Sequence, residues 1–432
     1  MAGHCFTPAA VASSESETGG MTARLKQPGG TLAPFNYPAF RAIWIANLAS
    51  NLGASIQSVG AAWLMTDLTR SHQLIALVQA SATVPIMLFG MFAGAIADNF
   101  DRRRVMLVAQ VGMLVTSGLL SLMTGLGLIT PYVLLAFTLT VGIGTSLNAP
   151  AWQASVRQQV GIRDLPQAIA LNSVAFNLAR SVGPALGGLL ISLWDVSLAF
   201  GVNAISYVAM IVVLLRWHPS PQEYERTRIL PAIAVGLRFC ARSSPVRRIL
   251  ARGLVLGFGV AGYQALVPAI ARGQLHGTQI EFGMMLGFFG IGSIVAAPQL
   301  GAARRRFGLE NVLAAGTIAF IVAQSILAVS NNVWEALPAT FIAGLAWVAI
   351  LTSINVAMQM RSPDAILGRC LSIYQSVTFG GMAIGSWFWG MLADLRSLPF
   401  ALHAAAGFLL AALVLMRLFV PMPRPGEGVI TA

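Results

Sequence analysis

GAIADNFDRRR at residues 94–104 and GAARRRFGLE at residues 301–310 have the same layout and lie about 207 residues apart. Each stretch follows an apolar segment, turns at small residues and carries three consecutive arginines ahead of the next apolar segment. Short arginine-rich links at matching places in two similar apolar halves are typical of secondary transporters built from internal repeats. The repeat therefore predicts a duplicated membrane protein that moves a solute.

The composition of the whole chain supports this interpretation. Of the 432 residues, 56% are hydrophobic and only 10% are charged, which is too apolar for a soluble protein of this size. A membrane-spanning helix needs roughly 20 mostly apolar residues, and such runs recur along most of the chain. The net charge of +12 is spread over the short links between these runs. It therefore predicts contact with the lipid bilayer and not with nucleic acid.

Twelve apolar segments can be drawn as spans, and the longest polar link divides them into six and six. The spans lie near 41–66, 74–97, 104–127, 131–154, 167–193, 198–216, 249–271, 282–303, 310–330, 336–360, 369–393 and 399–420. The division predicts a disordered cytoplasmic tail at 1–38, an N-terminal six-helix bundle at 39–216, a cytoplasmic linker at 217–248, a C-terminal six-helix bundle at 249–420 and a cytoplasmic tail at 421–432. Within the linker, residues 232–243 are predicted to form a short helix on the membrane surface.

Positive residues are distributed very unevenly between the links. With the amino terminus inside, 23 of the 27 Lys and Arg residues fall on the inner side, and the outer links hold Arg70, Arg272 and Arg396. Because positive residues favour the cytoplasmic side, both termini are predicted to be cytoplasmic. The chain has 26 arginines to one lysine and is rich in Ala and Gly, which suggests a multi-pass protein of the bacterial cytoplasmic (inner) membrane.

Several chemical classes are disfavoured by the residues present. Cys5, Cys240 and Cys370 are widely separated, without a C-x-x-C or a His/Cys cluster, so neither a disulfide framework nor a metal is expected. No G-x-x-x-x-G-K-[ST] run points to an ATP-driven pump. A membrane-embedded enzyme would need paired acids or His/Asp ligands at one depth. The spans show no such set, so we expect no cofactor and no catalysis and keep the enzyme as a remote alternative.

The first arginine-bearing stretch resembles the loop motif of the major facilitator superfamily, and the resemblance covers residues 38–420. The motif Gly-x-x-x-Asp-basic-x-Gly-basic-basic is matched by Gly94, Asp98, Arg102 and Arg103. Asn99 and Asp101 depart from it, where a basic residue and a glycine are usual. The resemblance implies an all-α membrane protein of 12 transmembrane helices in two pseudo-symmetric six-helix bundles, working by alternating access, with this loop as a cytoplasmic gate.

A second motif of that family, the Gly-Pro-x-x-Gly-Gly core of the fifth helix, is matched by Gly183, Pro184, Gly187 and Gly188. Glycines allow helices to approach closely, and a proline frees a carbonyl and bends the helix. Residues 163–190 are most similar to the branch that contains the enterobactin exporter. This resemblance implies efflux of a drug- or siderophore-like small organic molecule in exchange for protons. An uptake permease of the same fold stays open as the alternative.

Polar side chains recur on one helical face in two spans, at spacings close to three and four residues. The first span carries Asn47, Asn51, Ser55 and Ser58, and the tenth carries Thr352, Asn355 and Gln359. Because a polar stripe facing lipid is costly, both faces are predicted to line a wet substrate cavity. Hydrogen bonding between helices is the alternative.

Arg180 lies about 13 residues into a span of roughly 25, which is near the middle of the bilayer at about 1.5 Å per residue. Inserting such an arginine costs about 2.5–3.5 kcal/mol and requires a partner, and these boundaries place no acid at that depth. We expect Arg180, with Asn177 on the same face, to hold a negatively charged group of the substrate. The alternative is that Arg180 braces the bend of the fifth helix.

The seventh and eleventh spans are predicted to complete the cavity. A glycine-rich and therefore loosened segment of the seventh suits alternating access, and the polar groups concerned are Tyr263, Gln264, Tyr374 and Gln375. Ordinary packing is the alternative for the two aromatic residues. A pocket so drawn is apolar with scattered amides, so it suits a bulky amphipathic solute.

Energy coupling has few candidates in this sequence. Proton-driven carriers usually place a titratable carboxylate inside the membrane, and the predicted spans show none. Asp67, at the outer end of the first span, and Asp98, at the inner end of the second, are the coupling candidates. Asp98 is better explained as a conformational latch, because Arg102 and Arg103 nearby keep it ionised. We expect a monomer whose partners are a small-molecule substrate and protons.

Overall fold

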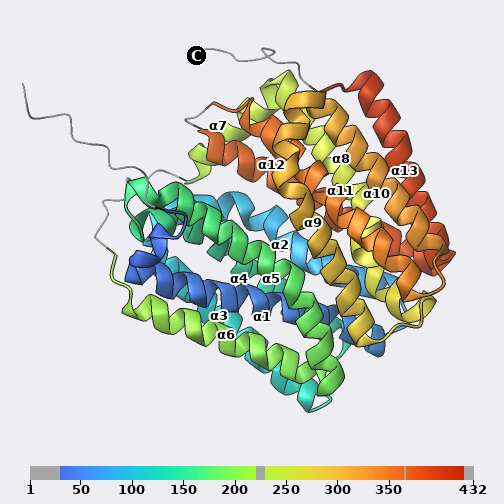
Figure 1. The fold of residues 1–432 in the computed structure, drawn as a ribbon, viewed down its shortest axis with the longest axis horizontal. Coiled ribbons are helices and arrows are strands. Elements are labelled where there is room, and N and C mark those ends of the chain that lie inside the picture. The colour runs from blue at the N-terminus through green and yellow to red at the C-terminus, as the bar shows by residue number, and fades with distance from the viewer. Residues whose placement is uncertain (1–29, 220–228, 364–365, 423–432) are drawn as a thin grey trace, which may run out of the picture.

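The computed structural model describes residues 30–219, 229–363 and 366–422, and this part of the chain forms thirteen α-helices and no strand. Figure 1 shows two helical bundles, α1–α6 and α8–α13, linked through α7. The helices are α1 (Pro38–Leu68), α2 (His72–Asn99), α3 (Arg102–Gly125), α4 (Pro131–Ser155), α5 (Leu165–Leu193), α6 (Val196–Arg216), α7 (Ile229–Arg242), α8 (Ser244–Ala269), α9 (Gln279–Phe307), α10 (Leu309–Val329), α11 (Val333–Gln359), α12 (Leu367–Leu395) and α13 (Leu398–Phe419). The predicted all-α fold is confirmed.

Within the described residues, ten helices are long and apolar enough to cross a membrane by themselves. The two other long helices are α1, with 31 residues, and α12, with 29. Their composition is more polar because they carry polar residues on faces that meet other helices. α1 packs mainly against α5 and α6, and α12 packs mainly against α2 and α8. Polar groups on such faces can be satisfied by protein, so these helices need not be apolar all round.

The connections between helices fall at two ends of the molecule. We call one end the arginine-poor end. It holds the links that follow α1, α3, α5, α8, α10 and α12, with Arg70, Arg272 and Arg396 as the arginines of these links. The opposite end, which we call the arginine-rich end, holds the three-arginine stretches and the segment that leads to α7.

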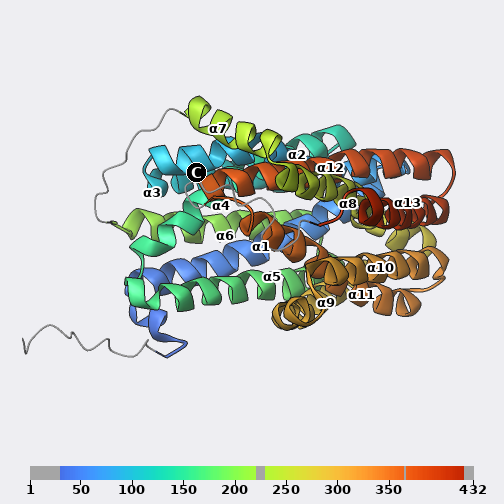
Figure 2. The ribbon, with the colours of Figure 1, turned by 90° about the horizontal axis from the view of Figure 1, so that it is seen from above.

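The two bundles meet along two seams, in which α2 runs beside α12 and α5 runs beside α9 (Figures 1 and 2). On the α5–α9 seam, a methyl group at Gly188 would lie 3.1 Å from the Cα of Gly283. On the α2–α12 seam, a methyl group at Gly390 would lie 2.7 Å from the Cβ of Ala76. Gly283 follows Ala76 by the same offset that relates the two arginine-rich stretches. The repeat seen in the sequence therefore produces two equivalent contacts between the bundles.

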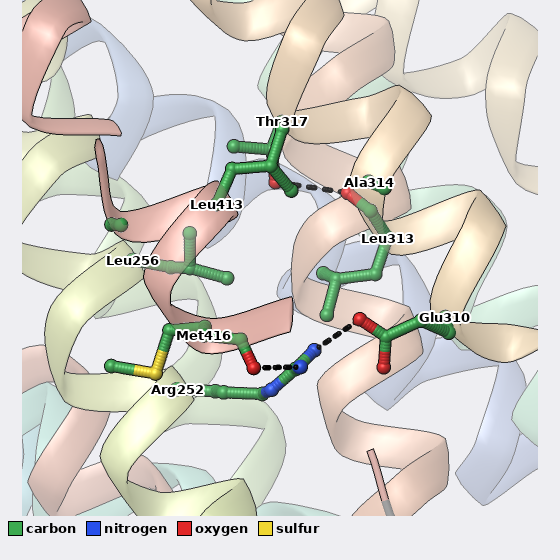
Figure 3. A pocket seen from close by; sticks show the side chains of 9 residues that line it. Arg252, Leu256, Glu310, Leu313, Ala314, Thr317, Leu413 and Met416 are labelled. Carbon is green, nitrogen blue, oxygen red and sulfur yellow. Dashed lines mark hydrogen bonds and ion pairs between the residues drawn. The ribbon is translucent and has the colours of Figure 1, made fainter. Parts of the chain in front are cut away.

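Arginines at the arginine-rich end satisfy carbonyl groups inside each bundle. Arg103 of α3 donates to the carbonyl oxygens of Leu214 and Leu215, at 2.7 and 2.8 Å, in the last turn of α6. In the other bundle, Arg252 of α8 donates to the carbonyl of Met416 near the end of α13, at 2.9 Å, and pairs with Glu310 at 3.0 Å (Figure 3). The last carbonyls of a helix have no partner within it, so these arginines stabilise each bundle separately.

The helix that joins the bundles, α7, corresponds to the predicted helix at 232–243. One of its faces packs on the start of α12: Gly236 is buried, and a methyl group there would lie 3.1 Å from an α12 side chain. Cys240 of α7 and Cys370 of α12 are both buried, and they lie near one another where the two helices pack. One face of α7 is thus held to the C-terminal bundle, and its other face is exposed.

Mild oxidation is expected to join Cys240 to Cys370, because the two buried cysteines are neighbours between α7 and α12. In a Cys5→Ser variant these are the two remaining cysteines of the chain. Treatment with copper phenanthroline should then remove both thiols from reaction with maleimide in most molecules, without forming dimers, as counted by mass spectrometry of the denatured protein. A further Cys240→Ser change should leave Cys370 free. Two reactive thiols after oxidation would contradict the packing of α7 on α12.

Candidate functional site

Arg180 lies near the middle of α5, at the seam between the two bundles. Its guanidinium carbon is 5.6 Å from the centre of the Phe289 ring on α9, in the other bundle. The side chain is half-buried, and no described carboxylate lies within 4.0 Å of it. A cation above an aromatic ring is attracted by about 0.5–2 kcal/mol, which is far less than a buried charge requires. Arg180 is therefore a positive charge at mid-depth without an anionic partner among the described residues.

Carboxylates are absent from the middle of the described helices. All eight acidic side chains that the structure describes lie at a helix end, either in the first or last turn or at the N-cap. They are Asp67, Asp101, Asp164, Asp195, Glu281, Glu310, Glu335 and Asp394. None of these eight carboxylates therefore lies at the depth of Arg180 along its own helix.

The Phe289 ring beside Arg180 is the first of three aromatic rings in contact with one another. Phe289 stacks on Tyr263 of α8, with 5.9 Å between ring centres, and Tyr263 meets Phe320 of α10 edge-on at 5.5 Å. Among the described residues, the Tyr263 hydroxyl and the Ser181 hydroxyl are buried without a hydrogen-bond partner. Buried polar groups without partners cost about 1–3 kcal/mol each. The seam thus offers a cation beside a ring face, with unpartnered hydroxyls on the next residue of α5 and on the ring that stacks on Phe289.

The Gly-Pro-x-x-Gly-Gly core of α5 packs in two directions. A methyl group at Gly183 would lie 2.5 Å from the Cβ of Ser55, and one at Gly187 would lie 3.2 Å from the Cα of Ile56, both on α1. Gly188 instead faces α9 in the other bundle. Pro184 cannot donate to the carbonyl of Arg180 one turn earlier, and this carbonyl faces α9, at 2.9 Å from a methyl group built at Gly290. The motif therefore lets α5 contact its own bundle and the opposite bundle at once.

The polar residues predicted to share one face of α1 lie in different environments. Asn51 donates to the carbonyl of Asn47 at 2.8 Å, and Ser55 donates to the carbonyl of Asn51 at 2.9 Å. Asn47 is buried, Ser55 lies beneath Gly183, and Ser58 is exposed. For Ser55 the geometry favours the alternative of helix contact over a cavity wall.

The polar face of α11 is bonded along its own helix and to α9. Arg304 donates to the Thr352 hydroxyl at 2.9 Å, and Gln359 donates to the side-chain oxygen of Asn355 at 2.5 Å. Gln359 is exposed and Asn355 is half-buried. These groups lie between the middle of α11 and its end at the arginine-rich end of the molecule, roughly two to four turns beyond mid-helix at about 3.6 residues per turn.

The remaining predicted cavity residues have different partners. Asn177 donates to the carbonyl of Ser173 at 2.8 Å, one turn before Arg180 on α5. Gln264 is half-buried with its amide nitrogen unpartnered, and Gln375 is exposed. Tyr374 is buried, and its hydroxyl donates to the carbonyl of Leu351 on α11 at 3.3 Å. The structure thus brings Arg180 and Tyr263 together through Phe289, whereas the hydroxyl of Tyr374 is taken up by its own bundle.

The predicted gate loop acts mainly within the N-terminal bundle. Arg102 donates to a carbonyl in the last turn of α4 at 3.1 Å, and Arg103 caps α6. A methyl group at Gly94 would lie 3.7 Å from the hydroxyl of Ser372 on α12, so this position does reach the other bundle. The side chain of Asp98 lies outside the described residues.

An ion pair and a histidine–carboxylate contact join the bundles at the arginine-poor end. Asp67, in the last turn of α1, pairs with Arg272 in the π-helical turn Ile270–Gln274 that follows α8. The Arg272 guanidinium carbon also lies 5.2 Å from the ring centre of Trp63. Asp394, in the last turn of α12, lies 2.9 Å from the ring nitrogen Nδ1 of His72 on α2. The two bundles are therefore fastened together at this end.

Sequence reasoning did not identify Phe289, Ser181, His72 or Asp394 as residues of interest. A phenylalanine in an apolar span carries no signal of its own, and a serine beside an arginine is ordinary. Asp394 at the end of a span has the pattern of many helix-end acids. A distance between helices that are far apart in the sequence was required to single out each of these four residues.

A protein-family model described as transmembrane secretion effector, within the major facilitator superfamily, matches residues 29–427. The staphyloferrin A transporter of Staphylococcus aureus is 25% identical over 346 residues, which is 79% of this chain and 86% of that protein. The enterobactin exporter of Shigella boydii is 26% identical over 398 residues, which is 90% of this chain and 93% of that protein.

Solved structures share the fold at much lower sequence identity. A crystal structure of the nucleoside transporter NupG has a TM-score of 0.72 at 12% identity and covers 88% of this chain and 99% of its own. The D-xylose-proton symporter has a TM-score of 0.68 at 15% identity, with coverage of 88% and 98%. Together with the two bundles and their paired seams, these matches confirm the fold expected from the arginine-rich repeats. The chain belongs to the transmembrane secretion effector family of the major facilitator superfamily, and it is a membrane transporter and not an enzyme.

Proposed function

We propose that this transporter exports a small organic anion, drug- or siderophore-like, by alternating access and in exchange for protons. The observation that carries the proposal is Arg180, a half-buried cation at the seam of the bundles without a described carboxylate partner. A negatively charged group of the substrate would neutralise it. The similarity to the enterobactin exporter and the staphyloferrin A transporter supports a siderophore-like substrate.

The proposed site consists of Arg180 for the anionic group, the rings of Phe289 and Tyr263 for an apolar or aromatic part, and the Ser181 and Tyr263 hydroxyls for hydrogen bonds. Arg180 comes from one bundle and Phe289 from the other, 5.6 Å apart. A substrate held between them touches both bundles, so binding can favour one arrangement of the bundles over another. Asn47, Asn51, Asn177, Gln264 and Gln375 remain proposed as outer members of the cavity.

The proposed orientation assigns the two ends of the molecule to the two sides of the membrane. The excess of Lys and Arg at the arginine-rich end favours a cytoplasmic location for it, with both termini inside and the protein in the bacterial inner membrane. The Asp67–Arg272 pair and the contact of His72 with Asp394 would then close the outer side. A protein closed at its outer side presents its site to the cytoplasm, which is the state in which an exporter would bind its substrate and an uptake permease would release it.

Proton coupling is proposed without an intramembrane carboxylate among the described residues. Asp67 and Asp98 are kept as coupling candidates. Asp67 forms one of the contacts that close the arginine-poor end. Its protonation would weaken the pair with Arg272 and so favour the opening of that end. The transporter is proposed to act as a monomer, because each seam and the site between them lie within one chain.

Transport in vesicles tests the proposal directly. Purified protein in proteoliposomes, oriented by protease protection of the carboxyl terminus, is loaded with enterobactin or staphyloferrin A as probes. We expect release of at least one probe to require the protein and to be accelerated when the compartment that receives it is acidic. Movement driven only toward the cytoplasmic side would instead identify an uptake permease. Equal rates with and without a proton gradient of either sign would contradict proton coupling.

A further inference from the structure

The first turn of α2 is capped by a carboxylate from the other bundle. Asp394 of α12 accepts hydrogen bonds from the backbone N–H groups of His72 and Gln73, at 2.6 and 3.1 Å, and from the Ser71 hydroxyl at 2.7 Å. The ring nitrogen Nδ1 of His72 lies 2.9 Å from the same carboxylate. One side chain of the C-terminal bundle therefore satisfies the exposed helix-end donors of the N-terminal bundle.

The equivalent helix of the other bundle, α9, is capped by its own residues and not by the opposite bundle. Thr278 and Glu281 form a capping box, in which Glu281 accepts from the Thr278 backbone N–H at 2.7 Å. At the matching place, α2 has Ser71 as its N-cap but Leu74 where α9 has Glu281. The two seams are otherwise equivalent at the arginine-poor end. The acid that caps α9 belongs to α9 itself, whereas the acid that caps α2 belongs to the opposite bundle.

This placement is not explained by capping alone, because α9 shows that an acid on the capped helix is sufficient. It is also unfavourable for α12. Six of the eight described carboxylates lie at helix N-termini, where the helix dipole favours negative charge. Asp67 and Asp394 lie at helix C-termini, where the dipole opposes it, and both bridge the bundles. Asp394 gains its stabilisation from α2, and that stabilisation disappears when the bundles separate at this end.

We infer that Asp394 is the positioning residue that holds the arginine-poor end closed while it is ionised, and that its protonation releases α2 and lets this end open. The inference rests on the proposed function, because opening of one end has a role only in alternating access. A neutral carboxyl group no longer compensates the positive end of the α2 dipole and offers weaker acceptors to its donors. The closed arrangement is therefore favoured while Asp394 is ionised and loses this support as the pH falls through its titration.

Other charged groups around this junction have different effects. His72 faces Asp394 directly, and a charged His72 would strengthen the pair. Arg70 precedes α2, and Arg396 follows α12 with its guanidinium carbon 6.0 Å from the ring centre of Phe400 on α13. The Asp67–Arg272 pair connects α1 with the turn after α8 and closes the same end. The side chain of Asp394 is 30% exposed, so protons from the solution on this side can reach it.

The test measures opening without any substrate. In a cysteine-free protein, spin labels are placed at Leu128 and Trp334, which are 60% and 67% exposed and lie at the arginine-poor end of different bundles. Double electron–electron resonance in nanodiscs then gives the fraction of molecules with this end open. We expect that fraction to stay low between neutral pH and about pH 4 and to rise only below about pH 4, because a carboxylate that accepts several hydrogen bonds is protonated only in more acidic solution than a free aspartate.

Three variants separate the contribution of Asp394 from general effects. Asp394→Asn should raise the open fraction by at least about fivefold at neutral pH, because charge-assisted hydrogen bonds are lost, and should flatten its pH response. Leu74→Glu combined with Asp394→Ser moves the acid onto α2, in the manner of α9. This variant should keep the helix capped and also show a raised, flattened open fraction. Asp195→Asn is the matched control, because Asp195 caps its own helix α6 at the same end through Ser197. It should behave as the unmodified protein.

The outcomes are distinct. If Asp394→Asn matches Asp195→Asn in open fraction and in pH response, the inference is wrong. If the double variant closes as tightly as the unmodified protein, Asp394 is a simple cap and the inference is also wrong. A protein that opens through Asp394 but moves neither probe would contradict the proposed function alone. A protein that transports a probe while its opening ignores Asp394 would contradict the inference alone.

Discussion

Replacing Arg180 with alanine is expected to lower the transport of an anionic probe by about 10- to 100-fold. A hydrogen bond to a charged group contributes about 1.5–3 kcal/mol, and about 1.4 kcal/mol corresponds to a tenfold change in an equilibrium constant. Arg180 is the cation beside Phe289 at the seam, 5.6 Å from the ring centre. Without it, the anionic group of the substrate would enter an apolar seam with no compensating charge.

The same variant should not reduce the amount of protein in the membrane. Arg180→Ala removes a charge that has no described carboxylate partner, and such a charge costs free energy in the bilayer. Initial transport rates in proteoliposomes, normalised to protein reconstituted, give the measurement. Arg180→Lys should retain part of the activity, since it keeps the charge but loses the planar stacking on Phe289. Arg305→Ala, at an exposed arginine of α9, is the control. Full transport by Arg180→Ala would exclude a binding role and favour bracing of α5.

Replacing Gly188 with valine is expected to reduce transport by about tenfold or more, whatever the substrate. Gly188 approaches the first turn of α9 so closely that a methyl group would meet the Gln279 carbonyl and lie 3.1 Å from the Cα of Gly283. Overpacking typically costs about 1–3 kcal/mol, which here would oppose the closed arrangement at the arginine-poor end. The bundles could separate at this end but could not return, so the cycle would stall.

The pseudo-equivalent change Gly390→Val should have the same effect on the other seam, where a methyl group would lie 2.9 Å from the Cα of Gln73. Gly112→Val on α3 is the control, because no atom lies within 4 Å of a methyl group built there. Spin labels at Leu128 and Trp334 should report a larger open fraction for both seam variants and an unchanged one for the control. Normal transport by Gly188→Val, at equal protein level, would show that this contact is not remade in each cycle.

The candidate site was predictable only in part. Arg180 stood out from the sequence because a charge in the middle of an apolar span is locally anomalous. Phe289 did not, because its role depends on the distance between α5 and α9. Ser55 lies on the helical face that the sequence predicted to be polar, yet it packs beneath Gly183, since a face can be directed at a neighbouring helix as well as at a cavity.

The helices, their grouping into two bundles and the repeat that relates them could be predicted from the amino-acid sequence. These features depend on local quantities: the length of each apolar run, the arginines between runs, and an offset that recurs along the chain. The contacts of Asp394 with α2, of Arg180 with Phe289 and of Cys240 with Cys370 could be identified only in the folded protein. Such pairs are fixed by how helices distant in sequence pack together, and a pattern within one helix carries no information about which residue of another helix will lie opposite.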